Sequence, residues 1–526
     1  MTAVTSWLDR RSYWQVAGLS FLIGLLLAAT FAPVHLVFLL PVCFSGLLIL
    51  LEQAANKKQA FLIGWFFGFG QFVAGLYWIG VAFTIDANAH AALIPVPTLL
   101  LPACLAIFTG ITTLVVYLSK TTGLARILFF AGIWTLTEYI RGLLFTGFPW
   151  NLVGYAWGDH LALLQWSAFI GIYGLTLLTV LISSLPAILA EKGITARYKR
   201  SVILIDCALL IMLVVGGYLR LQADPLPSID GTDIRIVQPN NDQQNKWRGQ
   251  TRFQHVKTLM TLSREDGFEN RHWIWPETAL PFFLTTDLRL QDYIVPRLPE
   301  GKSVITGAAR RDPEVKKYWN SVQALSNDGS IKGIYDKRHL LPYGEYLPIR
   351  EFFKASGIAS LIPALDNMSD FSFPEADMYK VTTYDDLPPA RTLICYEVAF
   401  PWEVSAAQKF DWILNVTNDA WFGHTSGPYQ HFVISRTRAI EQGVAMIRSA
   451  NKGVSALIDG YGRVLAKNSP REAGIIDGAI PAPLQNRPIY ARFGEIIPLS
   501  LLFVILSLAS LVAIWHTPND RNHRLK

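Results

Sequence analysis

Three β-like runs of this sequence end at side chains that can take part in covalent chemistry. HWIWPE ends at Glu277, GIYDK ends at Lys337 and LIC ends at Cys395. A thiol needs a base to become a thiolate, and a carboxylate can serve as that base when burial raises its pKa. A nearby ammonium favours the thiolate and stabilises the oxyanion that forms when a carbonyl is attacked. The three residue types together therefore indicate nucleophilic attack on a carbonyl group.

Each of these residues also has an ordinary structural explanation. Glu277 can cap a turn, and Lys337 can be solvated beside Asp336. Glu397, two positions after the cysteine, can be a buried ion-pair partner. Cys395 itself can be an inert thiol that packs as a small hydrophobic side chain. Spacing alone does not establish that the groups meet, so the elements that carry them must be considered.

The chain is divided into apolar and polar parts. Of its 526 residues, 51% are hydrophobic and 16% are charged, and the apolar residues concentrate in 13–219 and 496–515. Because about 20 apolar residues are needed to cross a bilayer as a helix, we predict about eight spans. The run 13–51 is expected to hold two spans, separated near Pro33 and His35. The other six are expected at 59–83, 90–118, 124–143, 162–190, 200–219 and 496–515.

Basic residues near the span ends predict the orientation of the chain. Groups such as Arg10 with Arg11 fall on one side, whereas the loops 86–90 and 145–160 on the other side contain no Lys or Arg. Both termini are therefore expected in the cytoplasm, and the polar half is expected outside it. This orientation accounts for the net charge of +6, and no basic patch indicates binding of nucleic acid.

We expect three parts in the chain. These are a bundle of about seven spans at 1–220, a catalytic domain at 221–495, and a last span with a cytoplasmic tail at 496–526. A cleavable signal peptide is an alternative for the N-terminus, because two arginines precede an apolar run that ends in ATFAP. Cleavage there would leave the second span beginning almost at once, so we favour an uncleaved first span.

The cysteines fit a reactive thiol outside the cytoplasm. Cys43, Cys104 and Cys207 lie inside predicted spans, so they cannot reach Cys395. Cys395 would then be a lone thiol in a compartment where disulfides normally form. An odd cysteine in that setting indicates intermolecular pairing or a reactive group, with the inert buried thiol still open as the alternative.

The polar half reads as an α/β domain. Mostly continuous apolar strands alternate with helical patterns at about 248–266 and 427–442, which is typical of sheets covered by helices. The segments 321–337 and 455–466 read as hairpins with Asn-Asp-Gly and Asp-Gly turns. Folds of this class place reactive residues at strand ends, where Glu277, Lys337 and Cys395 lie.

Longer motifs resemble a known superfamily. WPETALP, YDKRHLLPYGEYLP, LICYE and NDAWFG resemble the nitrilase (carbon–nitrogen hydrolase) superfamily, whose members use a Glu–Lys–Cys triad. Together with the predicted spans, they are similar to its integral membrane branch, the bacterial apolipoprotein N-acyltransferases, over nearly the whole chain. The resemblance implies a polytopic α-helical bundle plus a periplasmic αββα sandwich, in the bacterial inner membrane.

The resemblance also implies roles for individual residues. By position, Glu277 matches the general base, Lys337 the triad lysine and Cys395 the nucleophile. The supporting positions of the active site are matched by Glu345, Tyr396 and Glu397. The substrate-binding positions are matched by Trp247, Asn418 and Trp421. Lys452, after Asn451, departs from the small or amide residue expected there, which leaves the contacts of that loop open.

The implied reaction is acyl transfer in two steps. Cys395 would take a fatty acyl group from a membrane phospholipid, with phosphatidylethanolamine as the expected donor, and hold it as a thioester. The α-amino group of a diacylglyceryl-modified N-terminal cysteine of an apolipoprotein would then accept it. The expected partners are therefore the lipid donor, the apolipoprotein and membrane lipid. No metal cluster, phosphate-binding glycine loop or haem motif is apparent in the sequence, so no cofactor or metal is expected.

Two other functions are considered. A membrane-tethered nitrilase-type amidase would use the same triad with water as the acceptor, but eight spans would then have no explanation. A transporter with an inert outer domain would carry ionisable groups well inside its spans, whereas Glu138 and Asp206 lie near predicted span ends. Finally, the apolar segment 351–367 is either a membrane-facing lid with a hinge at Gly357 or part of an ordinary core.

Overall fold

The structure is a computed structural model, and it describes most of the chain. The described residues are 7–8, 10–84, 91–191, 193–243, 246, 249, 251–312, 314–348, 350, 371–374, 380–405 and 408–516. They form two compact units. One comprises Met1–Trp78, Pro95–Ala223 and Arg492–Lys526, and the other comprises Ile79–Ile94 and Asp224–Ala491. The first is the helical unit, and the second is the α/β unit.

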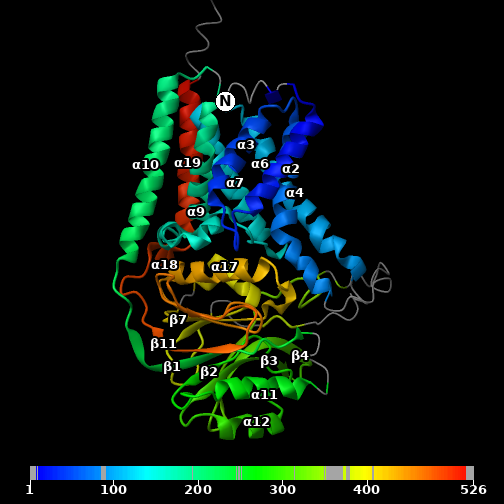
Figure 1. Ribbon diagram of the computed structural model, residues 1–526, viewed down its shortest axis with the longest axis vertical. Helices are drawn as coiled ribbons and strands as arrows, with labels where there is room; N and C mark the ends of the chain where they lie inside the picture. The colour runs from blue at the N-terminus through cyan, green and yellow to red at the C-terminus, as the bar shows by residue number, and fades with distance from the viewer. Residues whose placement is uncertain are drawn as a thin grey trace, which may run out of the picture. The chain divides into compact units, whose positions relative to one another are not determined.

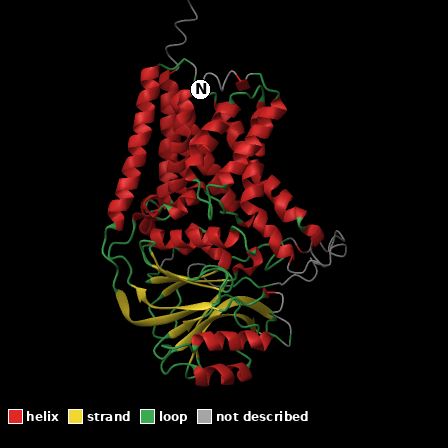
Figure 2. Ribbon diagram, in the orientation of Figure 1, coloured by secondary structure: helices red, strands yellow, loops and turns green. Residues whose placement is uncertain are grey.

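The helical unit is built from long apolar helices (Figures 1 and 2). Its main helices are α2 (Tyr13–Ala28), α3 (Leu40–Leu51), α4 (Lys57–Leu76), α6 (Leu101–Ser119), α7 (Gly123–Leu143), α9 (Ser167–Ser184), α10 (Ala196–Leu221) and α19 (Ile496–His516). Short helical turns connect them, including η1 (Val37–Leu39), η4 (Val96–Leu100), η5 (Leu144–Thr146), η6 (Val153–Asp159), α8 (Leu161–Leu164) and η7 (Leu185–Leu189).

Six of the helical segments are long and apolar enough to cross a membrane. They are Lys57–Thr84, Ala91–Ser119, Gly123–Thr146, Ser167–Leu189, Ala196–Leu221 and Ile496–Ile514. They correspond to the last six predicted spans. The first two predicted spans are the shorter apolar helices Tyr13–Ala28 and Val37–Leu51. The protein is therefore a membrane protein, while the count of eight spans is not confirmed.

Small residues let the helices of this unit approach one another. A Cβ added at Gly64 or Gly68 of α4 would overlap the hydroxyl groups of Thr113 or Thr109 on α6. Close approach of this kind is how membrane helices associate, because lipid and apolar side chains differ little in polarity. The glycines of GWFFGFG therefore serve helix packing.

The α/β unit contains two mixed sheets (Figure 2). The six-stranded sheet has the order β11-β1-β2-β3-β4-β5, and the five-stranded sheet has the order β10-β9-β8-β7-β6. The strands of the first sheet are β1 (Ser228–Gln238), β2 (His272–Ile274), β3 (Ser303–Asp312), β4 (Lys317–Ser326), β5 (Ile331–Asp336) and β11 (Gly474–Pro481). Those of the second are β6 (Ala390–Ile394), β7 (Trp412–Thr417), β8 (Ala445–Ala450), β9 (Ala456–Ile458) and β10 (Val464–Lys467).

The two sheets pack face to face, and helices cover their outer faces (Figure 1). One apolar core joins the sheets, with Ile236 and Val322 from the first and Leu414 and Ile447 from the second. A second core lies between the first sheet and the helices α11 (Arg252–Ser263) and α12 (Leu288–Ile294). Helix α17 (Gly427–Gln442) packs on β8 at the other side. The expected nitrilase-like α/β sandwich is confirmed.

Parallel pairing brings several strand ends to the same edges of the sheets. Strands β1, β2 and β3 are parallel neighbours, as are β6, β7 and β8. Strand β5 also runs parallel to β3, because each is antiparallel to β4. Carboxyl ends of parallel strands are where open α/β sheets place their sites. The residues that follow β2, β5, β6 and β7 are therefore candidates for a common site.

Candidate active site

Cys395 stands at a sharp turn between a strand and a short helix. Strand β6 ends at Ile394, and the 3₁₀ turn η10 (Cys395–Ala399) begins at the cysteine. The backbone of Cys395 has φ of 51°, a left-handed conformation that costs a non-glycine residue free energy. The thiol is free, as are Cys43, Cys104 and Cys207. This backbone conformation ends the strand, so Cys395 does not continue the alternating side-chain directions of β6.

The thiol needs help to ionise. Burial and the negative charge of Glu277 raise the pKa of Cys395 above its ordinary value, whereas the charge of Lys337 lowers it. The net direction is upward, so the thiol is protonated in the free protein. Because the thiolate is the reactive form, a base must remove the proton as the thiol reacts.

Lys337 lies at the centre of a buried group of charges. It directly follows β5, and its backbone N–H donates to the carbonyl of Asn320 at 2.7 Å. Its Nζ lies 2.8 Å from Oε2 of Glu345 and 3.8 Å from Oε1 of Glu277. Burial disfavours the ammonium, but the two carboxylates outweigh it, and the pKa of Lys337 is raised. The lysine is therefore a fixed positive charge beside the thiol.

Asn320 joins the two carboxylates of this group. From β4, its Nδ2 donates to Oε1 of Glu277 at 2.9 Å and to Oε1 of Glu345 at 2.8 Å. All three residues are less than a tenth exposed. Sequence reasoning missed Asn320, although a polar amide within the strand YWNSVQAL was a signal that could have pointed to it. The amide fixes one oxygen of each carboxylate.

The position of Glu277 also depends on a close approach between two backbones. A Cβ added at Gly307 of β3 would lie 2.4 Å from the backbone nitrogen of Thr278 and 2.6 Å from Cα of Glu277. Real side chains do not tolerate such distances, and Thr278 already has φ of 46°. The glycine on β3 therefore allows the Glu277 turn to lie where it does.

Glu397 ties the cysteine turn to the lysine loop. It accepts hydrogen bonds from the backbone N–H groups of Ile394 at 2.7 Å, Arg338 at 2.7 Å and His339 at 3.1 Å. The hydroxyl of Tyr335 donates to it at 3.0 Å. Burial raises the pKa of Glu397 despite these bonds. The carboxylate therefore holds together two loops that are far apart in the sequence.

Tyr396 directly follows Cys395 and packs against two neighbouring rings. Its side chain is buried, and its ring meets Phe400 edge-on at 5.0 Å and His339 at 5.8 Å between centroids. These contacts help to hold the turn after Cys395 in place.

A second buried network lies behind the cysteine. Nε2 of His431 is 3.2 Å from the carbonyl oxygen of Cys395, and its Nδ1 is 2.8 Å from Oδ1 of Asp419. The other oxygen of Asp419 is 2.8 Å from the guanidinium of Arg448. His431 and Asp419 were not singled out in the sequence, because a lone histidine in a helix carries no specific signal. The network supports the backbone of Cys395 from α17 and β8.

The three expected substrate-binding positions differ in their surroundings. Asn418 is buried: its Nδ2 donates to Gln243 at 2.7 Å, and its Oδ1 accepts from Asn451 at 3.0 Å. Trp421 is 40% exposed. Trp247 and the segment 351–367 lie outside the described residues. The substrate contacts and the lid thus stay predictions.

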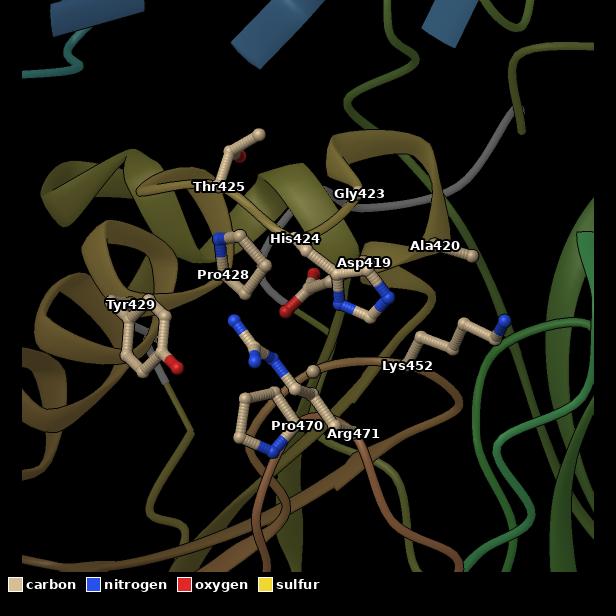
Figure 3. A pocket seen from close by; sticks show the side chains of 11 residues that line it. Asp419, Ala420, Gly423, His424, Thr425, Pro428, Tyr429, Lys452, Pro470 and Arg471 are labelled. Atoms are coloured by element: carbon tan, nitrogen blue, oxygen red, sulfur yellow. The ribbon is translucent and has the colours of Figure 1, made fainter. Parts of the chain in front are cut away.

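A pocket borders the second network (Figure 3). It is lined by Asp419, Ala420, Gly423, His424, Thr425, Pro428, Tyr429, Lys452, Gly453, Pro470 and Arg471. The Arg471 guanidinium and the Asp419 carboxylate point into its centre, whereas the chain of Lys452 extends away toward Asp242, with which it pairs. Glu277, Lys337 and Cys395 are not among the residues that line this pocket.

One group of side chains has the donor types of a metal site. His272, Asp385 and Asp386 place ligand atoms within 4.8 Å of one another. However, Nζ of Lys302 lies 3.3 Å from Nε2 of His272 and 3.7 Å from Asp386. An ammonium there supplies the positive charge, so the group is explained as an ion-pair cluster.

Known proteins of one family are similar to nearly the whole chain. Residues 23–185 match the family model of the apolipoprotein N-acyltransferase N-terminal domain, and residues 300–486 match that of carbon-nitrogen hydrolases. An apolipoprotein N-acyltransferase of Rhodopseudomonas palustris is 38% identical, covering 95% of this chain and 95% of the relative. One of Bradyrhizobium diazoefficiens is 37% identical, with coverage of 95% and 95%. A solved carbon-nitrogen hydrolase from Helicobacter pylori is 13% identical with a TM-score of 0.35, covering 51% of this chain and 94% of that chain.

Proposed function

The chain belongs to the apolipoprotein N-acyltransferase family, and on that premise we propose how its buried charges carry out lipoprotein N-acylation. The protein is an acyltransferase with a lipid acyl donor and a lipoprotein acceptor. We assign Cys395 as the nucleophile, Glu277 as the general base and Lys337 as the cation that stabilises the oxyanion. The observation that supports this most strongly is the buried group in which Lys337 contacts both Glu277 and Glu345.

In the first half-reaction, Glu277 takes the proton of Cys395 as the sulfur attacks an ester carbonyl of the donor phospholipid. The carbonyl oxygen becomes negative and is stabilised by the ammonium of Lys337. The tetrahedral intermediate then collapses, and the ester C–O bond breaks. Glu277 returns the proton to the departing alkoxide, which leaves as a lysophospholipid. The acyl group stays on Cys395 as a thioester.

In the second half-reaction, the α-amino group of the acceptor attacks the thioester. Glu277 takes a proton from the amine, and the C–S bond breaks when the new intermediate collapses. The proton passes to the sulfur, which regenerates the thiol and completes an amide bond. A single base thus serves both steps, which requires that it is held in one place. Asn320 meets this need by fixing Oε1 of Glu277.

The membrane setting completes the proposal. We place the chain in the bacterial inner membrane with both termini in the cytoplasm and the α/β unit in the periplasm. Phosphatidylethanolamine is the proposed donor and a diacylglyceryl apolipoprotein the acceptor. The domain boundaries proposed from the sequence are 1–220, 221–495 and 496–526, and Asn418, Trp421 and Trp247 are proposed to contact the substrate.

Substitution of the nucleophile tests this function. The purified Cys395→Ala variant in lipid nanodiscs should transfer no acyl group from phospholipid to a diacylglyceryl peptide, with its thermal unfolding unchanged. Cys207→Ala is the matched control, because Cys207 is also a free cysteine but lies in the helical unit. Transfer by folded Cys395→Ala would overturn the assignment. Hydrolysis of a fatty amide to free fatty acid and amine by the wild type, without peptide acylation, would instead support the amidase alternative.

A further inference from the structure

The segment LPYG, residues 341–344, forms a tight turn shortly after Lys337, and it is referred to below as the LPYG turn. The backbone N–H of Gly344 donates to the carbonyl of Leu341 at 3.2 Å, and the N–H of Tyr343 donates to the carbonyl of Tyr346 at 2.9 Å. A Cβ added at Gly344 would lie 2.9 Å from the side chain of Leu341, so the turn needs a glycine there. These contacts hold the turn in one shape.

The LPYG turn is bound to the proposed oxyanion-stabilising cation through one oxygen atom. Oε2 of Glu345 accepts a hydrogen bond from the backbone N–H of Leu341 at 2.8 Å. The same oxygen lies 2.8 Å from Nζ of Lys337. The backbone N–H of Glu345 in turn donates to the carbonyl of Leu341 at 2.8 Å. The turn and the ammonium of Lys337 are therefore fixed to the same carboxylate oxygen, and the turn lies beside the place where the carbonyl of the donor would react.

Tyr343 occupies a position of the turn that favours glycine. Its φ is 60°, and it is the third residue of a β-turn, where a positive φ is usually supplied by glycine or asparagine. A bulky aromatic residue in this conformation is strained. Its side chain is 55% exposed, so burial within the unit does not account for the choice of a tyrosine. A contact that the ring makes with a ligand would account for it.

The other exposed side chains around this turn are also apolar. Leu341 is 38% exposed and Phe373 is 53% exposed, and the ring of Phe373 meets that of Tyr346 edge-on at 5.1 Å between centroids. The backbone N–H of Phe371 donates to the carbonyl of Glu345 at 3.0 Å, which holds the two segments side by side. Single exposed apolar side chains are common on proteins. A group of them beside a buried ion pair is instead typical of an interaction site.

We propose that the LPYG turn holds the acyl chain of the donor, and that Tyr343 is a residue that determines acyl-chain specificity. This inference rests on the proposed function, because it identifies a contact of the substrate at the same site. The acyl chain is bonded to the carbonyl carbon that Cys395 attacks, and Lys337 stabilises the oxygen of that carbonyl, so the chain begins close to the turn. The four residues of the turn carry no charge, which suits a hydrocarbon chain and not a phosphate or ammonium head group.

The experiment removes the ring of Tyr343 and leaves the backbone of the turn as it is. Tyr343→Gly is suited to this, because glycine favours the left-handed conformation that the tyrosine has. Single-turnover acylation of Cys395 is measured in the full-length protein, in detergent micelles free of phospholipid, with p-nitrophenyl palmitate and p-nitrophenyl acetate. Tyr343→Gly should react with the palmitate about tenfold or more slowly, the lower end of what one apolar contact contributes to specificity. It should react with the acetate at the wild-type rate, and Tyr343→Phe should keep both rates.

Lys120→Gly is the matched control and should keep both rates, because Lys120 also has a positive φ, of 54°, but belongs to the helical unit. An unchanged palmitate rate in Tyr343→Gly would overturn the inference. Equal slowing with both esters would also overturn it, since the turn would then act by supporting Lys337. If Tyr343→Gly does not fold, Tyr343→Asn decides in the same way, because asparagine also tolerates this conformation. Failure of the proposed function is distinguishable, because the wild type would then react with the p-nitrophenyl esters but not with phospholipid.

Discussion

Replacement of Asn320 by alanine should slow the reaction without removing any reacting group. Nδ2 of Asn320 donates to Glu277 at 2.9 Å and to Glu345 at 2.8 Å, and the residue is 4% exposed. A hydrogen bond to a charged group contributes about 1.5–3 kcal/mol. If the bond to Glu277 holds the base in its reactive position, its loss raises the activation barrier by that amount. Since 1.36 kcal/mol is a factor of ten, acylation should slow about 10- to 150-fold.

The assay is single-turnover formation of the acyl-enzyme from a fluorescent phospholipid in nanodiscs. Asn320→Asp separates positioning from packing, because it keeps the shape but puts a third carboxylate beside two others. It should be slower than Asn320→Ala. Asn327→Ala, in the turn at the opposite end of β4, is the matched control and should react at the wild-type rate. A folded Asn320→Ala protein that acylates at the wild-type rate would refute the positioning role.

Three further predictions concern the same group. Lys337→Met should slow acylation about 10²- to 10³-fold, the usual cost of losing one oxyanion donor. Because Lys337 lowers the pKa of Cys395, alkylation of the thiol by iodoacetamide should also shift to higher pH in this variant. An unshifted profile would contradict the interaction between Lys337 and the thiol. Glu277→Gln should slow both thioester formation and transfer to the peptide in rapid-quench experiments, and an effect on affinity alone would exclude it as the base. Gly307→Ala should destabilise the protein by about 1–3 kcal/mol in thermal unfolding and should also slow acylation, because the new Cβ would lie 2.6 Å from Cα of Glu277. A wild-type unfolding free energy together with a wild-type acylation rate would mean that the Glu277 turn can move freely.

Much of the fold could be predicted because hydrophobic patterning determines it directly. The last six predicted spans coincide with long apolar helices, since a stretch of about 20 apolar residues has few alternatives to a membrane helix. Helix α17 occupies 427–442 as predicted, while the pattern at 248–266 gave a shorter helix, Arg252–Ser263. Whether the run 13–51 crosses the membrane twice was harder to predict. Its two helices are shorter than a full span, and composition does not say how each lies in the bilayer.

The candidate site could be predicted only in part, for a different physical reason. Glu277, Lys337 and Cys395 stand at strand ends with reactive groups, so type and position both pointed to them. Asn320 and His431 act by holding other groups, and a single polar side chain inside a strand or helix is only a weak signal in sequence. Their importance depends on pairing across the sheets, which only the folded chain shows.

In the proposed reaction, the acyl group is carried as a thioester on Cys395 between the lipid donor and the lipoprotein acceptor. The most direct test loads the enzyme with a phospholipid carrying one labelled acyl chain and maps the label by peptide mass spectrometry. A diacylglyceryl peptide is then added and the label is followed in time. A thioester on Cys395 should form before the product, and it should be consumed at the rate at which the peptide amine becomes acylated. Product formation with no label on Cys395, or a labelled thioester that persists while the peptide is acylated, would contradict it.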